Sequence, residues 1–133
     1  MHKILMTEET INLYGICYTP NKICSEPDEY LRLEAVEQGF ALKQLISDTS
    51  HLVRSTIARL KYGHEQLAND PNWRVRANVA RYCKPSLLKQ FINDENHFVR
   101  YIVVQRGYHL EHFTADSDEE IADLARYQLR HKR

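Results

Sequence analysis

Histidine, cysteine and arginine are the residue types in this 133-residue chain whose spacing could support chemistry. His109 and His112 lie three residues apart, a spacing at which two imidazoles on one helical face could bind zinc. The pair lacks the HExxH spacing and has no obvious third ligand, so we expect an exposed pair and no metal. Cys83 is followed by Lys84, which favours a reactive thiolate, but its place after an expected helix is more typical of a small turn residue.

A series of arginines recurs at a fixed distance from acidic residues. The acidic residues are Glu26, Asp48, Asp70 and Asp94, and the arginines that follow each by six positions are Arg32, Arg54, Arg76 and Arg100. A row of guanidinium groups could bind phosphates. The five fixed donors of arginine suit a structural task equally well, in which each guanidinium bonds acidic residues or helix-end carbonyls of its own or the adjacent repeat. We favour the structural role.

Residue patterns typical of enzymes are absent from the sequence. The four glycines never cluster, which excludes a Gly-rich phosphate loop, and no GxSxG or kinase-like pattern occurs. Acidic residues such as Asp70 and Asp94 recur at equivalent positions, where helix capping would account for them without an asymmetric acid–base pair. We therefore expect neither an enzyme nor a bound cofactor.

The elements that must position these residues follow from an internal repeat. An acidic residue, four variable residues and then Val-Arg recur after intervals of 22 and 24 residues, with weaker copies on either side. The repeats start at Glu26, Asp48, Asp70, Asp94 and Asp116. Apolar residues five and nine positions after each start, with a further one near twelve, have helical spacing. They place Val53, Ile57 and Leu60 on one apolar stripe, and Val75, Val79 and Tyr82 on the next. Each repeat is therefore predicted to begin with a helix of about three turns, followed by a tight turn and a short second helix.

Glycine and proline positions agree with this frame. All four glycines fall 11 to 15 residues after a start, where the first helix of each repeat should end. Pro27 and Pro71 directly follow a start, which predicts proline at the first helical position and the preceding acid as N-cap. The last repeat, at 116–119, has the pattern of a capping box.

One such repeat cannot bury its own apolar face, whereas stacked repeats can. The predicted fold class is therefore all-α, a solenoid of five to six two-helix units of 22 to 24 residues each. Residues 26–129 are expected to form the solenoid. Residues 1–25 would form an irregular N-terminal cap from a degenerate repeat, and residues 130–133 a basic C-terminal tail.

The repeat resembles a known family. Asp-Pro-Asn-Trp-Arg-Val-Arg-Ala-Asn-Val-Ala at 70–80, followed by Lys-Pro-Ser-Leu-Leu-Lys-Gln-Phe-Ile-Asn-Asp at 84–94, is similar to the leucine-rich repeat variant and, more loosely, to HEAT-like repeats. The resemblance implies that each unit pairs an α-helix with a second, often 3₁₀, helix, and that the units wind into a right-handed superhelix. In that family an N-terminal cysteine cluster can hold an iron–sulfur centre. Only Cys17 and Cys24 lie there in this chain, too few for four thiolate ligands, so that cofactor is not expected.

Charge is unevenly distributed although the formal net charge is zero. Residues 52–107 carry a net charge of +6, between −4 over residues 1–51 and −2 over residues 108–133. Basic residues 11 to 14 positions after the repeat starts would align into a basic ridge, formed by Arg59, Lys61, Arg81, Lys84 and Arg106. The ridge could follow a phosphate backbone or meet an acidic protein surface. Alternatively, these cations stabilise helix C-termini.

A second row lies three positions after the repeat starts, at the expected beginnings of the first helices. Its members are Glu29, His51, Trp73, His97 and Glu119. Trp73 is a candidate anchor for a partner, with packing between loops as the equal alternative. His64 occupies a position held by leucine in other repeats, so we expect it to be at least half-buried.

Composition and the repeat together indicate a small, soluble interaction protein. Three cysteines without a CxxC argue against a disulfide framework and favour a reducing, cytoplasmic location. The longest apolar run near the start is Ile4–Met6, far short of a signal peptide or a membrane span. We expect a non-catalytic adaptor or stoichiometric inhibitor that binds a protein partner through the basic ridge, together with Trp73. Direct nucleic-acid binding through the same ridge is the alternative.

Overall fold

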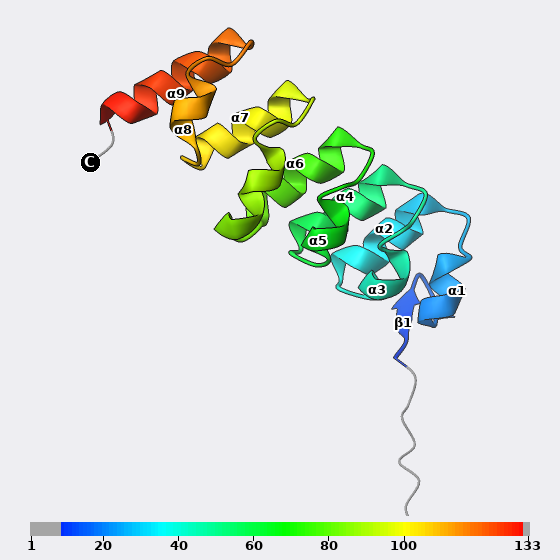
Figure 1. The fold of residues 1–133 in the computed structure, drawn as a ribbon. Helices are drawn as coiled ribbons and strands as arrows, with labels where there is room; N and C mark the ends of the chain where they lie inside the picture. The colour runs from blue at the N-terminus through cyan, green and yellow to red at the C-terminus, as the bar shows by residue number, and fades with distance from the viewer. Residues whose placement is uncertain (1–8, 132–133) are drawn as a thin grey trace, which may run out of the picture.

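The computed structural model describes residues 9–131, which form ten helices and one two-stranded sheet (Figure 1). The elements are β1 (Ile11–Leu13), β2 (Ile16–Tyr18), α1 (Pro20–Cys24), α2 (Glu29–Glu37), α3 (Leu42–Leu45), α4 (His51–Arg59), α5 (His64–Leu67), α6 (Trp73–Tyr82), η1 (Pro85–Phe91), α7 (His97–Gln105), α8 (Leu110–Phe113) and α9 (Glu119–His131). The described chain is mostly helical, as the apolar spacing predicted. The small sheet was not predicted.

The five longer helices pack in chain order, α2 on α4, α4 on α6, α6 on α7 and α7 on α9. Figure 1 shows the loops that precede these helices gathered along one side of the row, which we name the loop edge. The ends of the longer helices and the turns that lead into α3, α5, η1 and α8 lie on the other side, which we name the turn edge. Each longer helix therefore has the preceding and the following longer helix as its neighbours.

The hydrophobic core runs along this row of helices. Val53 and Ile57 of α4 are completely buried, as are Val75 and Val79 of α6, in agreement with the predicted apolar stripes. The short helices contribute the largest fully buried side chains, among them Phe91. Burying one such side chain completely contributes about 1.5–3 kcal/mol to the stability of the folded chain.

The five longer helices begin three residues after the repeat starts, as predicted, but the acidic start residues do not cap them. The N-cap lies two residues after each start, where a short side chain accepts hydrogen bonds from the first-turn N–H groups. These N-cap residues are Asp28, Ser50, Asn72, Asn96 and Asp118. The predicted capping by the start residues is therefore wrong, and Pro27 and Pro71 precede the N-cap instead of following it.

The third repeat departs from the others where its first helix ends. In the second repeat, Gly63 adopts a left-handed φ of +64° before α5, and a Cβ there would overlap the side chain of Ile46. In the third repeat, Cys83 and Lys84 are extended and lead into the 3₁₀ helix η1 at Pro85. The extra length of this repeat lies in its short helix, because η1 has seven residues whereas α5 has four.

The two ends of the described chain differ from their expected form. In the region predicted as an irregular cap, β1 and β2 pair as an antiparallel hairpin across Tyr14 and Gly15, both with positive φ, as a tight two-residue turn requires. At the other end, α9 continues through His131 into the predicted tail. Residues 1–8 and 132–133 lie outside the described chain. None of the described helices is both long enough and apolar enough to cross a membrane.

Candidate functional site

The arginine series forms a structural network along the loop edge, which we name the Arg–Asp ladder. Each guanidinium donates from Nε to the start aspartate of the next repeat, and from Nη1 to the main-chain carbonyl of its own start residue. The Nε–Oδ2 distances are 2.7 Å for Arg32–Asp48, 2.8 Å for Arg54–Asp70, 2.8 Å for Arg76–Asp94 and 2.9 Å for Arg100–Asp116. The side chains are 5–14% exposed. The favoured structural role is confirmed, and these guanidinium groups are occupied by protein.

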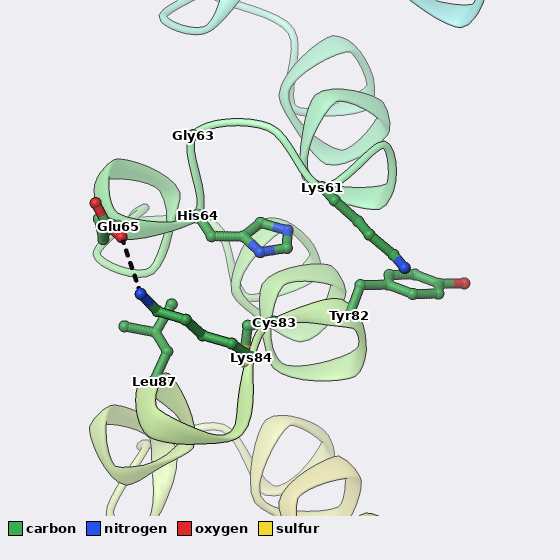
Figure 2. A pocket seen from close by; sticks show the side chains of 8 residues that line it. All are labelled: Lys61, Gly63, His64, Glu65, Tyr82, Cys83, Lys84 and Leu87. Carbon is green, nitrogen blue, oxygen red and sulfur yellow. Dashed lines mark ion pairs between the residues drawn. The ribbon is translucent and has the colours of Figure 1, made fainter.

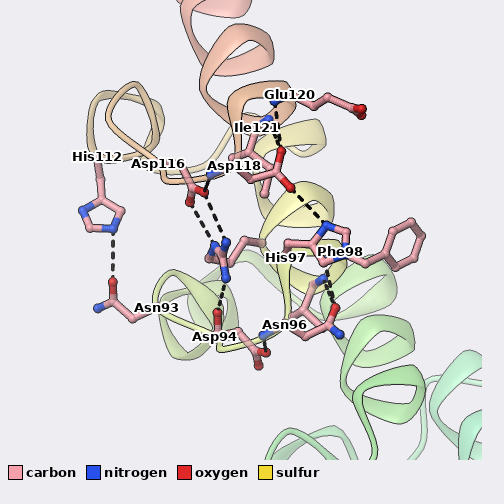
Figure 3. A network of polar contacts seen from close by, with 12 residues as sticks. Asn93, Asp94, Asn96, His97, Phe98, His112, Asp116, Asp118, Glu120 and Ile121 are labelled. Carbon is pink, nitrogen blue, oxygen red and sulfur yellow. Dashed lines mark hydrogen bonds and ion pairs between the residues drawn. The ribbon is translucent and has the colours of Figure 1, made fainter.

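Electrostatics within the ladder favour the charged forms. Hydrogen bonds to Asp48 and Asp94 raise the pKa of Arg32 and Arg76, respectively. Burial opposes ionisation of Asp116, but the hydrogen bonds from Arg100 and from the Asp118 N–H outweigh it, so the pKa of Asp116 lies below its ordinary value. Figure 3 shows this end of the ladder around Asp94 and Asp116.

All five basic-ridge residues are exposed, and four of them come from two helices that pack together. Arg59 and Lys61 extend from the end of α4 and the following turn, and Arg81 and Lys84 from the end of α6 and the start of η1. The structure brings the two pairs together because α4 packs on α6. Lys84 Nζ lies 3.8 Å from Glu65 Oε1, with both side chains mostly in solvent, where an ion pair contributes little.

Arg106, the fifth ridge residue, has a different role. Its Nη1 donates to the Ala80 carbonyl at 2.8 Å and lies 3.6 Å from Cys83 Sγ. The expected alternative, stabilisation of a helix C-terminus, therefore applies to Arg106, although the helix is α6 of the preceding repeat. His64 makes the equivalent contact at the end of α4, with Nε2 2.7 Å from the Ala58 carbonyl, and is half-buried as predicted.

Cys83 is buried in the turn between α6 and η1. Burial raises the pKa of its thiol, and the nearby Arg106 offsets this only in part. A thiol that is both protonated and covered reacts slowly, which favours the interpretation of Cys83 as a small turn residue.

A cleft of about 500 Å³ opens at the turn edge, between α5 and η1 (Figure 2). Lys61 and Lys84 line it from two successive repeats, together with His64, Glu65 and Tyr82. It lies where the extra residues of the third repeat follow α6. The irregularity of this repeat thus coincides with the place where the basic residues gather.

Three apolar side chains are exposed beside the basic ones, and the prediction that placed Leu60 and Tyr82 on the apolar stripes of their helices is wrong. Leu60, Tyr62 and Tyr82 are each 37–38% exposed. They interleave with cations in Arg-Leu-Lys-Tyr at 59–62 and in Arg-Tyr-Cys-Lys at 81–84. That alternation at the same place in two successive repeats was a signal available in the sequence. We name this set the turn-edge surface: Arg59, Leu60, Lys61, Tyr62, Arg81, Tyr82 and Lys84.

Trp73 is not part of the turn-edge surface. It lies in the first turn of α6, at the loop edge, and is separated from Arg81 by eight residues of helix, or about 12 Å. Its ring packs edge-on against Phe98 with centroids 5.6 Å apart, and the Arg74 guanidinium lies 4.6 Å from the ring centre. Trp73 is therefore half-buried between helices and lies about two helical turns away from the basic ridge.

The histidine pair lies at the start of α8. The rings of His109 and His112 are 5.7 Å apart, and His112 Nε2 lies 3.1 Å from Asn93 Oδ1 (Figure 3). Over residues 9–131, no group of three or more histidine, cysteine or acidic side chains is placed to hold a metal ion.

Comparisons with known proteins returned no match for this chain among family models, curated proteins or solved structures.

Proposed function

We propose that this chain is a helical-repeat solenoid that acts as a non-catalytic interaction module, an adaptor or a stoichiometric inhibitor, and binds an acidic segment of a protein partner through the turn-edge surface. The observation that carries the proposal is the presence of four exposed cations and three exposed apolar side chains at the ends of α4 and α6, where Lys61, Tyr82 and Lys84 line an open cleft. In the described chain, Glu65 is the one carboxylate within ion-pair distance of these cations.

The solenoid part of the proposal is supported by the packing of the longer helices in chain order and by the Arg–Asp ladder that joins successive repeats. Its right-handed winding rests on the resemblance of residues 70–94 to leucine-rich repeat variants. Stacked repeats present a rigid surface, so little ordering of the module would accompany binding.

A protein partner is favoured by the mixture of side chains in the turn-edge surface. Arginine and tyrosine are enriched among the residues that dominate protein interfaces, because they combine large contact area with directional hydrogen bonds. Arg59 and Arg81 can each receive a carboxylate in a two-point, charge-assisted contact. Tyr62, Tyr82 and Leu60 would exclude water around these contacts and strengthen them.

A non-catalytic role is supported by the state of the recurring acids. Asp48, Asp70, Asp94 and Asp116 each accept hydrogen bonds from an arginine and from a main-chain N–H two residues later. Carboxylates held in this way are committed to the ladder and are poor acid–base groups.

Single-stranded nucleic acid is a second candidate, favoured by the exposed rings of Tyr62 and Tyr82 beside basic residues. Bases stack on such rings while cations neutralise the phosphates. This candidate predicts an affinity that falls steeply with salt, because bound phosphates release counterions. A mixed apolar and ionic protein interface would respond less steeply.

Capture from the source cells tests the protein candidate. The full chain, the Arg59→Glu/Arg81→Glu variant and a Lys43→Glu/Lys89→Glu control would be immobilised, and the bound proteins quantified by mass spectrometry. Both variants change the net charge equally, and Lys43 and Lys89 are exposed outside the turn-edge surface. We expect a partner retained by wild type and control and lost from the first variant. Equal retention by all three proteins would contradict the proposal.

Fluorescence anisotropy with single-stranded RNA and duplex DNA, at low and near-physiological salt, tests the second candidate. Binding that falls steeply with salt and disappears in Arg59→Glu/Arg81→Glu, but not in the control, would favour nucleic acid over protein. The absence of binding at low salt would exclude it.

A further inference from the structure

A smaller groove lies between α7 and α9, outside the turn-edge surface. It encloses about 250 Å³ and is lined by His97, Phe98, Tyr101, Asp118 and Glu120, with Ile121. Pockets for drug-sized molecules occupy about 300–1,000 Å³, so this groove has the size for a single side chain of a partner.

One wall of the groove is aromatic and held in place. Phe98 and Tyr101 of α7 are nearly parallel, with an interplanar angle of 17° and ring centroids 6.4 Å apart. Trp73 of α6 packs against Phe98, with ring planes 75° apart, and restricts its movement. Phe98 nevertheless remains 38% exposed, so part of its ring is open to a ligand. The faces of such rings carry negative partial charge and attract cations.

The opposite wall is acidic. Asp118 is committed to the protein, because one carboxylate oxygen caps α9 and the other lies 3.1 Å from His97 Nδ1. Glu120 is exposed, and none of the ion pairs formed among residues 9–131 includes its carboxylate. Figure 3 shows Phe98 extending from α7 and Glu120 extending from α9 toward the same side of the molecule.

We propose that this groove binds an arginine side chain of a protein partner, with the guanidinium against the Phe98 and Tyr101 rings and its N–H groups donating to the Glu120 carboxylate. Charge complementarity selects the occupant, since the groove offers an uncommitted carboxylate beside aromatic faces. Arginine matches both features, because its planar guanidinium stacks on aromatic rings and donates two parallel hydrogen bonds to a carboxylate. This site does not depend on the function proposed for the turn-edge surface.

The test is an NMR titration of the full-length, ¹⁵N-labelled chain with a blocked tripeptide, acetyl-Ala-Arg-Ala-amide. The matched probe replaces arginine by citrulline, which has the same shape without the charge. We expect saturable shifts of the main-chain amides in the first turns of α7 and α9, with a dissociation constant on the order of 1 mM. The citrulline peptide should leave these amides unshifted. Equal binding of both peptides would overturn the proposal.

Two variants locate the binding site. Phe98→Leu keeps an apolar side chain but removes the ring, and Glu120→Gln removes the charge while keeping the shape. Each should raise the dissociation constant about threefold or more, as expected for an exposed cation–π contact or ion pair. Glu111→Gln on α8 makes the same charge change outside the groove and should leave binding unchanged. A loss in Glu111→Gln equal to that in Glu120→Gln would show general charge attraction and refute the site.

The outcomes are separable from those for the turn-edge surface. Arg59→Glu/Arg81→Glu should leave the arginine-peptide titration unchanged, because those residues lie at the other edge of the row. If the groove binds arginine and the turn-edge variant still captures every partner, only the proposed function fails. The reverse pattern refutes only the groove.

Discussion

Arg54 donates two hydrogen bonds to the carboxylate of Asp70, which begins the next repeat. The Nε–Oδ2 and Nη2–Oδ1 distances are 2.8 and 3.2 Å. The same carboxylate accepts the main-chain N–H of Asn72 at 2.9 Å, and Asn72 caps α6. One guanidinium thus fixes the loop from which the next helix begins. Each arginine–aspartate contact therefore joins two repeats and also positions the loop that precedes the first helix of the second one.

Breaking this buried pair should destabilise the protein strongly. Arg54→Met leaves the Asp70 carboxylate buried without its partner, a change that costs about 3–5 kcal/mol of unfolding free energy. Urea denaturation followed by circular dichroism would measure the loss. Arg54→Met/Asp70→Asn should lose less than Arg54→Met alone, because the buried charge is gone.

The control is the exposed Lys84–Glu65 pair. Lys84→Met should change the unfolding free energy by less than about 1 kcal/mol, since exposed pairs contribute little. A loss as large as that of Arg54→Met would contradict the distinction between the two pairs.

Acid should destabilise the fold in part through Asp116. The pKa of Asp116 is lower in the folded chain than in the unfolded chain, so the unfolded state binds protons first as the pH falls. The corresponding stability is fully present above the unfolded pKa of about 3.9 and is lost as the pH falls through the lower folded value. Denaturation midpoints measured from pH 6 down to about pH 2 should therefore fall less steeply for Asp116→Asn. An unchanged acid slope would refute this contribution.

Replacement by alanine should destabilise the protein more at Gly63 than at Gly39. Both have positive φ, which costs alanine about 1 kcal/mol, but only at Gly63 would the added Cβ overlap Ile46. Gly63→Ala should therefore lower the melting temperature more than Gly39→Ala. Adding Ile46→Ala should reverse part of the additional loss, because it removes the overlapping atoms. No difference between the two glycine variants would contradict the packing at Gly63.

Arg106 should act on stability more than on partner binding. Arg106→Met removes the donor to the Ala80 carbonyl and should cost about 1 kcal/mol. Hydrogen exchange should become faster in the last turn of α6, in the repeat before the substituted residue. Partner capture should remain closer to wild type than in Arg59→Glu/Arg81→Glu. A variant with unchanged stability and lost capture would restore Arg106 to the binding surface.

Much of the fold could be predicted because its main signal is local and repeated. Apolar residues at helical spacing gave the five longer helices, and Val53 and Ile57 lie fully buried as that spacing required. The N-caps were misplaced because an aspartate before a helix is a good cap by composition. Whether Asp70 caps α6 depends on Arg54, which recruits its carboxylate from the preceding repeat.

The site was predicted less completely because its residues depend on contacts between repeats. The cations at 59, 61, 81 and 84 share a place in the repeat, so their common edge could be inferred. Arg106 shares it too, but its partner Ala80 lies 26 residues away and is reached only once the two repeats are stacked. The separation of Trp73 from Arg81 could have been inferred from helical rise alone, since the two lie eight residues apart on one helix.

The Arg–Asp ladder runs along the loop edge alone, which makes the row of helices mechanically asymmetric. Charge-assisted bonds between rigid loops resist separation there, whereas apolar packing and single contacts such as Arg106–Ala80 join the repeats at the turn edge. The loop edge should therefore resist stretching more strongly than the turn edge. A pulling force along the row should separate the repeats at the turn edge before it separates them at the loop edge.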